Sequence, residues 1–179
     1  MTTEYLLNRE MEHVLAALTP ANRLVMRVAL HTGLRLSDVL GLRTEQIGNR
    51  FWVTESKTGK RRMVGLPTRL VEALRSHAGG NGWCFPHTRD RMRHRTRQAV
   101  WHDVKRAAKA FRLPQNVAPH SARKCYAVEL MDKYGDIKRV QKTLRHDRAT
   151  TTVLYAMADR LLEAKLAAKV KRQKSAESR

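Results

Sequence analysis

The chain opens with apolar residues at the spacing of an amphipathic helix. Asn8 can cap a helix, and the apolar positions that follow are three or four residues apart. Pro20 suits the first turn of a second helix, and Gly33 suits its end, because glycine adopts the left-handed conformation without strain. A short third helix is predicted from Ser37. The apolar face of the first helix consists of Met11, Val14, Leu15 and Leu18.

The spacing of apolar residues changes between residues 44 and 67. Residues 51–54 are aromatic or β-branched, residues 63–66 are largely apolar, and Thr58-Gly59 between them is a turn signal. This pattern predicts a small antiparallel sheet. Its connecting tip, residues 57–62, is strongly basic.

Helical spacing returns after this sheet, so the predicted fold class is mainly α with a small antiparallel β-sheet (α+β). Residues 1–172 are expected to form one domain, and residues 173–179 a polar tail. We expect the tryptophans at positions 52, 83 and 101 in the core. The further predicted helices cover about 68–77, 89–111, 120–134, 137–146, 149–157 and 160–172.

The chain is strongly basic, because 36 Lys and Arg residues against 16 Asp and Glu residues give a formal net charge of +20. The excess is concentrated in residues 51–112, which hold 15 basic and 4 acidic residues. A compact domain with such a charge repels itself unless it binds a polyanion, and clustered basic charge is typical of nucleic-acid binding.

Composition also excludes several classes of protein. No apolar run approaches the roughly 18–20 residues that cross a bilayer. Two cysteines cannot form a disulfide framework, and 42% apolar residues are too many for a wholly disordered chain. Residues 1–4 lack the features of a secretion signal. A membrane protein and a disulfide-stapled secreted module are therefore not expected, and we expect a cytoplasmic protein.

Four short segments carry polar residues that a scaffold does not need. They contain two arginines, two histidines, a lysine and a tyrosine, which suit phosphoryl transfer without a metal. Arginine neutralises and orients a phosphodiester, histidine moves a proton near neutral pH, lysine can protonate a leaving alkoxide, and tyrosine can be a covalent nucleophile. The candidates are Arg35 with Asp38 nearby, Lys57, His120 with Arg123, and His146 with Tyr155.

The same segments give little support for a metal site. Asp136, Asp147 and Asp159 lack the tight spacing of a two-metal nuclease. Cys84 and His87 form a single C-x-x-H pair, whereas zinc sites need four ligands. We therefore expect neither a metal nor a cofactor.

Taken in order, the segments resemble the catalytic domain of the tyrosine recombinases, the phage integrase family. The resemblance rests on Thr-Gly-Leu-Arg, Ser-Lys-Thr-Gly-Lys, His-Ser-Ala-Arg, Leu-Arg-His and Thr-Thr-x-x-x-Tyr, and covers about residues 8–170. It implies the catalytic-domain fold of the DNA breaking-rejoining enzymes. It also implies a site-specific recombinase of the integrase type that needs neither metal nor ATP.

The resemblance implies a role for each matching residue. Tyr155 would attack the scissile phosphate and leave a 3′-phosphotyrosyl intermediate, while Arg35 and Arg123 would hold its non-bridging oxygens. Lys57 would protonate the departing 5′ oxygen, with Lys60 as the alternative on the same tip. The three supporting residues are His120, which would assist proton transfer from the tyrosine, His146, which would hydrogen-bond the phosphate, and Asp38, which would support the first arginine.

The expected partner is double-stranded DNA, and the expected location of the protein in the cytoplasm is the nucleoid. The amphipathic helix at 160–172 is expected to dock on a neighbouring protomer, giving a tetramer on DNA, or else to pack within its own chain. Accessory DNA-bending proteins are possible partners, and the N-terminal core-binding domain of most family members is expected to be absent. The expected DNA contacts are Lys60, Arg61, Arg62, Arg89, Arg91, Arg93, Arg95 and Arg97.

Two alternatives to a recombinase follow from the same residues. A type IB topoisomerase shares the catalytic set, although His120 favours the recombinase because that position generally holds another basic residue in the topoisomerases. A non-catalytic DNA-binding regulator would not need to keep Arg35, Arg123 and Tyr155 together.

Overall fold

The computed structural model describes residues 3, 4 and 6–144. The chain forms two compact units, Met1–Ala127 and Val128–Arg179. The first contains α1 (Asn8–Ala17), α2 (Pro20–Thr32), α3 (Leu36–Leu40), a 3-10 turn η1 (Thr44–Gln46), β1 (Arg50–Thr54), β2 (Arg61–Gly65), α4 (Thr68–Ala78), α5 (Arg97–Ala110) and the start of α6 (Pro119–Tyr134).

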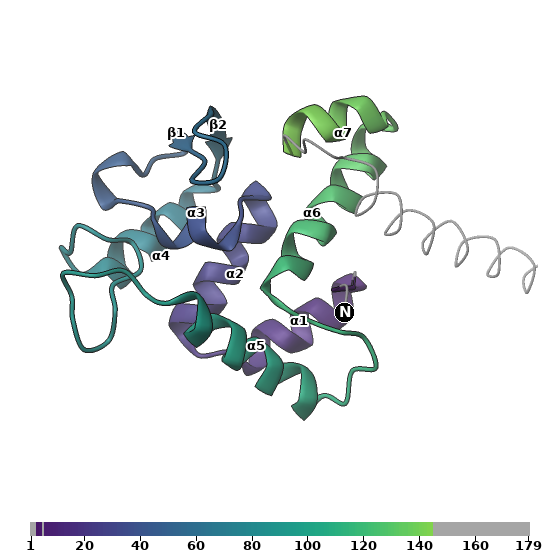
Figure 1. Cartoon of the computed structure of the whole chain (residues 1–179), viewed down its shortest axis with the longest axis horizontal. Coiled ribbons are helices and arrows are strands. Elements are labelled where there is room, and N and C mark those ends of the chain that lie inside the picture. Colours follow the sequence, from purple (N-terminus) through teal and green to yellow (C-terminus); the bar gives the residue numbers. More distant parts are fainter. Residues whose placement is uncertain (1–2, 5, 145–179) are drawn as a thin grey trace, which may run out of the picture. The chain divides into compact units, whose positions relative to one another are not determined.

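The predicted fold class is confirmed, since helices dominate and β1 and β2 form a two-stranded antiparallel sheet. Within the first unit, α1, α2 and α5 pack on one another, and α4 packs on α2 (Figure 1). The prediction of one domain over residues 1–172 reaches beyond the described residues and stays a prediction.

The second helix begins and ends as its sequence predicts. Pro20 occupies the first turn, where its missing N–H costs nothing. Gly33 ends the helix in the left-handed conformation, with φ 62°, and its N–H donates to the carbonyl of Ala29 at 2.8 Å. This left-handed turn redirects the chain toward α3.

The sheet has a buried and an exposed face, because side chains alternate along each strand. Phe51 and Val53 of β1 are buried, and so is Val64 of β2. The register pairs Trp52 with Met63, and both side chains are about half exposed on the opposite face.

The expected core positions of the tryptophans are wrong. Trp52 is 49% exposed and Trp101 is 43% exposed. Trp83 is half-buried, with the Arg43 guanidinium 3.5 Å from its ring centre. The other two tryptophans also have a basic group over the ring, Arg61 at 5.3 Å from the ring centre of Trp52 and Lys105 at 5.7 Å from that of Trp101. The core of the described residues is instead built mainly from aliphatic residues, with Phe51 and Phe85 as its aromatic members.

The predicted basic helix over residues 89–111 is wrong in its first third. The helix α5 begins at Arg97, and the hydroxyl of Thr96 caps it by accepting from Ala99 N at 3.2 Å. Residues 89–96 form turns and an isolated bridge between Pro86 and His94. A residue that prefers the cap position thus ends the irregular segment.

A buried carboxylate joins α5 to the start of α2. Asp103 Oδ2 accepts from Thr19 N at 2.9 Å, from Thr19 Oγ1 at 2.8 Å and from Asn22 Nδ2 at 2.7 Å. Burial alone would raise the pKa of Asp103, but the hydrogen bonds from Asn22, Thr19 and Arg106 outweigh it and lower the pKa to about 2. The packing of these two helices therefore depends on an ionised carboxylate.

The described part of the second unit consists of the end of α6 and α7 (Ile137–Leu144). Gly135, with φ 64°, makes the turn between them. The Arg139 guanidinium lies 3.8 Å from the ring centre of Tyr134. In residues 3, 4 and 6–144 we find no helix with the length and apolar character to cross a membrane.

Candidate functional site

Arg35 stands at the N-terminus of α3, two residues after the left-handed Gly33. Its side chain is 21% exposed, and its Nη1 donates to Glu55 Oε2 at 2.8 Å. An arginine side chain has five N–H donors in a fixed plane. This is the one hydrogen bond of the Arg35 guanidinium within the described residues, so further donors are free to bind a ligand.

Glu55 follows β1 directly and is completely buried. Its Oε2 also accepts from Thr58 Oγ1 at 3.1 Å, and its Oε1 lies 3.9 Å from Arg62 Nε. Burial by itself would raise the pKa of Glu55, but hydrogen bonds from Arg35 and Thr58 and the charges of Arg35 and Arg62 outweigh burial and lower the pKa. The carboxylate is therefore ionised at neutral pH.

Two more arginines reach the turn that carries Arg35. Arg62 of β2 donates to the carbonyl of Thr32, and Arg123 of α6 donates to the carbonyl of Gly33. These carbonyls lie at the C-terminus of α2, where the helix dipole favours positive charge. Three guanidinium groups thus converge on one turn, from three different elements.

Arg123 is almost completely buried, with 3% of its surface exposed. Burial, followed by repulsion from Arg35 and Arg62, lowers the pKa of Arg123 to about 10, against the attraction of Glu55 and Asp38. The group is still protonated at neutral pH. A phosphate that bound here would relieve the repulsion among the three arginines.

Asp38 was expected to support Arg35, but its carboxylate contacts a different residue. Asp38 Oδ1 accepts from Ser56 N at 2.9 Å and from Ser56 Oγ at 2.6 Å. The carboxylate that pairs with Arg35 is that of Glu55. Asp38 therefore joins α3 to the turn between the two strands, and among the described residues its carboxylate forms no hydrogen bond or ion pair with the Arg35 guanidinium.

Lys57 is exposed on this turn, between Ser56 and Thr58. Lys60 is exposed on the same turn, and its carbonyl accepts from Glu55 N at 3.0 Å. Both lysines can therefore reach a ligand that lies against the turn.

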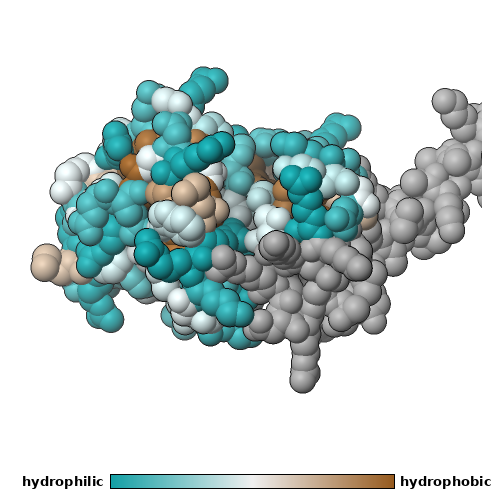
Figure 2. Space-filling view, turned by 90° about the horizontal axis from the view of Figure 1, so that it is seen from above, coloured by the Kyte–Doolittle hydropathy of each residue, from teal (hydrophilic) through white to brown (hydrophobic). Residues whose placement is uncertain are grey.

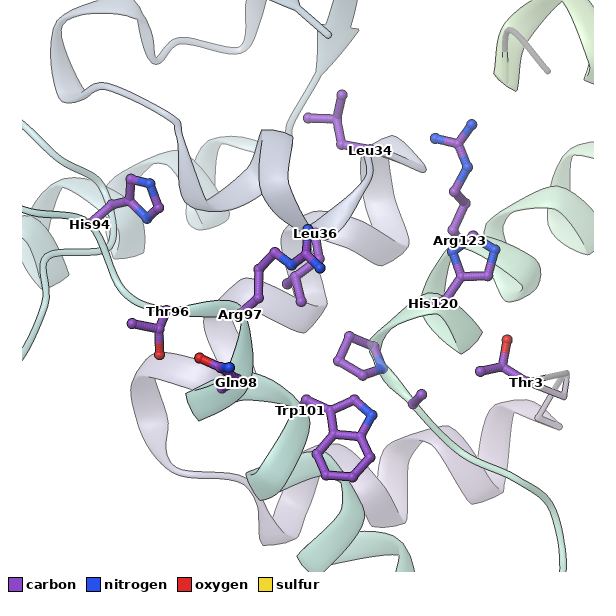
Figure 3. Close-up of a pocket in the computed structure, with 12 residues that line it drawn as sticks. Thr3, Leu34, Leu36, His94, Thr96, Arg97, Gln98, Trp101, His120 and Arg123 are labelled. Atoms are coloured by element: carbon purple, nitrogen blue, oxygen red, sulfur yellow. The ribbon is translucent and has the colours of Figure 1, made fainter. Parts of the chain in front are cut away.

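His120 is exposed in the first turn of α6, one turn before Arg123. Both line a pocket of about 740 Å³ within the first unit. Figure 3 shows Arg97 and Trp101 of α5 on one side of this pocket and His120 and Arg123 of α6 on the other. Leu34 and Leu36, on either side of Arg35, also line it. The structure thus brings the His120–Arg123 pair close to the Arg35 turn.

His146 and Tyr155 lie outside the described residues, as do the helix expected over 160–172 and the tail over 173–179. Their predicted roles stay predictions. In the part of the chain that the structure describes, no group of three or more His, Cys, Asp or Glu side chains could hold a metal ion.

The residues expected to contact DNA separate into buried or half-buried members and exposed members. Much of the surface seen in Figure 2 is hydrophilic. Arg62 does not fit the expectation, because it is 6% exposed and binds Thr32 and Glu55 inside the protein. Arg95 is half-buried, and its Nε donates to Asn22 Oδ1 at 2.6 Å. Arg91 is exposed, although its Nη2 donates to the carbonyl of Ala78. The other exposed members are Lys60, Arg61, Arg89, Arg93 and Arg97.

Sequence analysis missed Glu55 and the inward position of Arg62. The alternation along the strands holds the signal, because Phe51 and Val53 point inward and position 55 continues that series. In β2 the buried Val64 likewise places position 62 inward. An acid and a base at inward positions of paired strands predict a buried ion pair, since a buried charge needs a partner.

Comparison with known proteins gives one family. The family model described as the phage integrase family matches residues 4–160. The tyrosine recombinase XerD of Pseudomonas aeruginosa is 30% identical in an alignment of 146 positions, and the match covers 75% of this chain and 48% of XerD. The chain spans about half the length of the curated relatives it matches.

Solved structures show the same fold. The XerH site-specific recombinase, in a post-cleavage complex with its palindromic difH substrate, matches with a TM-score of 0.71 and 22% identity. The match covers 94% of this chain and 53% of XerH. The lambda integrase catalytic core matches with a TM-score of 0.66 and 23% identity, over 82% of this chain and 95% of the core.

Proposed function

The chain belongs to the phage integrase family, and from this premise we propose that it is a site-specific DNA recombinase. It cleaves and rejoins double-stranded DNA through a 3′-phosphotyrosyl intermediate, without metal or ATP. The observation that carries the proposal is the convergence of Arg35 and Arg123 on the turn at the end of α2. Glu55 links Arg35 to the turn between the two strands, which carries Lys57.

The arginine cluster supports phosphate binding. Arg35 has free donors, and Arg123 lies one helical turn from the exposed His120 at the same pocket. Preorganised cations stabilise the charge that develops on a phosphoryl group in the transition state, and they need no rearrangement when the reaction occurs. We propose that Arg35 and Arg123 bind the non-bridging oxygens of the scissile phosphate.

In the proposed cleavage step, the hydroxyl oxygen of Tyr155 attacks phosphorus and the bond to the 5′ oxygen breaks. His120 accepts the tyrosine proton, and His146 hydrogen-bonds the phosphate. Lys57 donates a proton to the 5′ oxygen, which leaves as a hydroxyl. Attack by a 5′-hydroxyl on the phosphotyrosine reverses these transfers and rejoins the strand.

The exposed basic residues support binding along the DNA backbone. Phosphate contacts position a protein on DNA, whereas base contacts read its sequence. We assign a phosphate-binding role to the exposed Lys60, Arg61, Arg89, Arg91, Arg93 and Arg97.

The proposal extends to assembly and location. Recombination exchanges strands between two duplexes, so we propose a tetramer on DNA in which the helix expected over 160–172 docks on a neighbouring protomer. DNA-bending proteins would assist its assembly. A protein that acts on chromosomal DNA would work in the cytoplasm, at the nucleoid.

Covalent trapping tests the proposed chemistry. The protein is incubated in EDTA with supercoiled DNA that carries the sequence flanking its own gene, and the reaction is stopped with detergent. We expect protein attached to 3′ ends for the wild type and none for Tyr155→Phe, while both bind DNA. Binding without attachment by the wild type would contradict the proposal and favour a regulator. A plasmid relaxed without exchange between two sites would favour a topoisomerase.

A further inference from the structure

The turn that carries Lys57 is held on both sides by buried carboxylates. Ser56, the residue before the lysine, donates its N–H and its hydroxyl to Asp38 Oδ1. Thr58, the residue after it, donates its hydroxyl to Glu55 Oε2 at 3.1 Å. The exposed Lys57 therefore stands between two fixed neighbours.

The main chain of Glu55 closes the same turn. Its N–H donates to the carbonyl of Lys60 at 3.0 Å, and its carbonyl accepts from Gly59 N at 2.8 Å. Both the backbone and the side chain of Glu55 thus fix the conformation of residues 56–60. A lysine on such a turn loses less conformational entropy when it meets a ligand than a lysine on an unrestrained loop.

One oxygen of Glu55 connects this turn to Arg35. Oε2 accepts from Arg35 Nη1 at 2.8 Å as well as from Thr58 Oγ1. The position of the arginine and the position of the turn are therefore set by the same atom. No other carboxylate among the described residues forms an ion pair with Arg35.

The charge of Glu55 also offsets repulsion within the arginine cluster. Arg35, Arg62 and Arg123 are close enough that the first two lower the pKa of the third, and Glu55 acts in the opposite direction. Without the carboxylate, repulsion would drive Arg35 outward, because it is the most exposed of the three.

We propose that Glu55 is a positioning residue that holds Arg35 and the Lys57 turn in the geometry for cleavage. The inference rests on the proposed recombinase function. It assigns to Glu55, and not to Asp38, the support of the first arginine. A buried ion pair adds little to stability compared with apolar packing, so a role in positioning accounts better for an acid at this site.

The first test measures cleavage by Glu55→Gln, which keeps the size of the side chain and removes its charge. The substrate is a duplex with the site mapped by covalent trapping, nicked near the scissile phosphate so that the cleaved fragment dissociates. We expect the single-turnover rate constant at saturating DNA to fall about 10²-fold, as misplaced catalytic groups do. The DNA dissociation constant should stay within about threefold of wild type, because the substitution removes no phosphate contact.

Glu72→Gln is the matched control, since Glu72 is exposed on α4 and makes no contact with the site. A purely structural role for Glu55 would lower the fraction of active protein, and hence the amplitude, at an unchanged rate constant. That result, or a rate constant within about threefold of Glu72→Gln, would overturn the proposal.

The second test separates the two groups that Glu55 holds. In a duplex with sulfur in place of the bridging 5′ oxygen, the leaving group is a thiolate that needs no proton, so Lys57 becomes dispensable. Thr58→Val removes the hydrogen bond to Glu55 Oε2 and the one that Thr58 Oγ1 accepts from Lys60 N at 3.4 Å, both within the turn, and leaves Arg35 paired with Glu55. We expect the cleavage rate constant of this variant to fall about tenfold with the oxygen substrate, the effect of a lost hydrogen bond to a charged group. With the sulfur substrate the rate constant should return to that of the wild type.

Glu55→Gln should recover only in part with the sulfur substrate, because Arg35 is still misplaced. A deficit that sulfur leaves unchanged in both variants would overturn the role at Lys57. A wild-type protein that never attaches to DNA would instead contradict the proposed function. The two failures are therefore distinguishable.

Discussion

Arg123 donates a hydrogen bond to the carbonyl oxygen of Gly33, 90 residues earlier in the chain. Gly33 is the left-handed residue that ends α2, and Arg35 follows it by two positions. The two arginines assigned to the phosphate are thus fixed relative to each other through the backbone of one turn. The geometry of the site depends on main-chain atoms as well as on catalytic side chains.

Replacing Arg123 by lysine should disable cleavage while the protein still binds DNA. Lysine keeps the charge, but its ammonium cannot reproduce the planar donors of a guanidinium that also binds Gly33. We expect the cleavage rate to fall by about 10²–10³-fold, the effect of losing one preorganised donor. The measurement is single-turnover cleavage with Arg69→Lys, exposed on α4, as the control. Equal rates for the two variants would exclude Arg123 from the phosphate site.

Gly33→Ala should destabilise the protein, because residue 33 has a positive φ of 62°. A left-handed conformation costs a residue with a Cβ about 1–2 kcal/mol. We expect the free energy of unfolding, measured with urea, to fall by that amount. Gly48→Ala is the control, since Gly48 has no positive φ and a Cβ there would meet only the Arg50 carbonyl at 3.7 Å. If both variants unfolded alike, the left-handed turn would not be required.

Arg93→Gln should change DNA binding, whereas Arg62→Gln should change the stability of the fold. Arg93 is exposed, so its loss should weaken DNA binding and reduce the slope of log K against log salt by about 1. Arg62 is buried beside Glu55, so its loss should leave that slope unchanged and lower the free energy of unfolding. Titrations of DNA binding at several salt concentrations, together with urea unfolding, separate the two effects. A reduced slope for Arg62→Gln would mean that its side chain reaches DNA.

Local signals in the sequence predicted much of the scaffold. Pro20 and Gly33 mark the ends of α2, and the turn at Thr58-Gly59 connects the two predicted strands. These features follow from backbone preferences of single residues, which act regardless of the rest of the fold. The order of the motifs was enough to identify the family, which the match over residues 4–160 confirms.

Two of the wrong or missing predictions concern charged residues, the arginines before α5 and the buried acid at position 55. Five arginines occur at every second position from 89 to 97, a spacing that would place them on all sides of a helix. The segment before Arg97 forms turns instead. The acid at position 55 was missed because its alternation with Phe51 and Val53 was not followed past the end of the strand. The partner of Arg35 could be identified only in three dimensions, because the acid three residues after it binds Ser56 instead.

Asp103→Asn should remove a pH-dependent contribution to the free energy of unfolding. The pKa of Asp103 is about 2 in the folded protein against an ordinary 3.8, so the ionised form is favoured by folding. Its contribution is fully present above pH 4 and is lost as the pH falls toward 2, because the unfolded chain takes up the proton first. The shift corresponds to about 2 kcal/mol at pH 7.

Urea unfolding between pH 2 and pH 7 measures this contribution. We expect Asp103→Asn to be less stable than wild type by about 2 kcal/mol at pH 7 and the difference to shrink toward pH 2. Asparagine retains an oxygen to accept from Thr19 and Asn22, so most of the loss should come from the charge. Glu72→Gln, which removes an exposed carboxylate, should follow the wild-type curve. A difference that stayed constant down to pH 2 would show that packing, and not ionisation of Asp103, joins α5 to the start of α2.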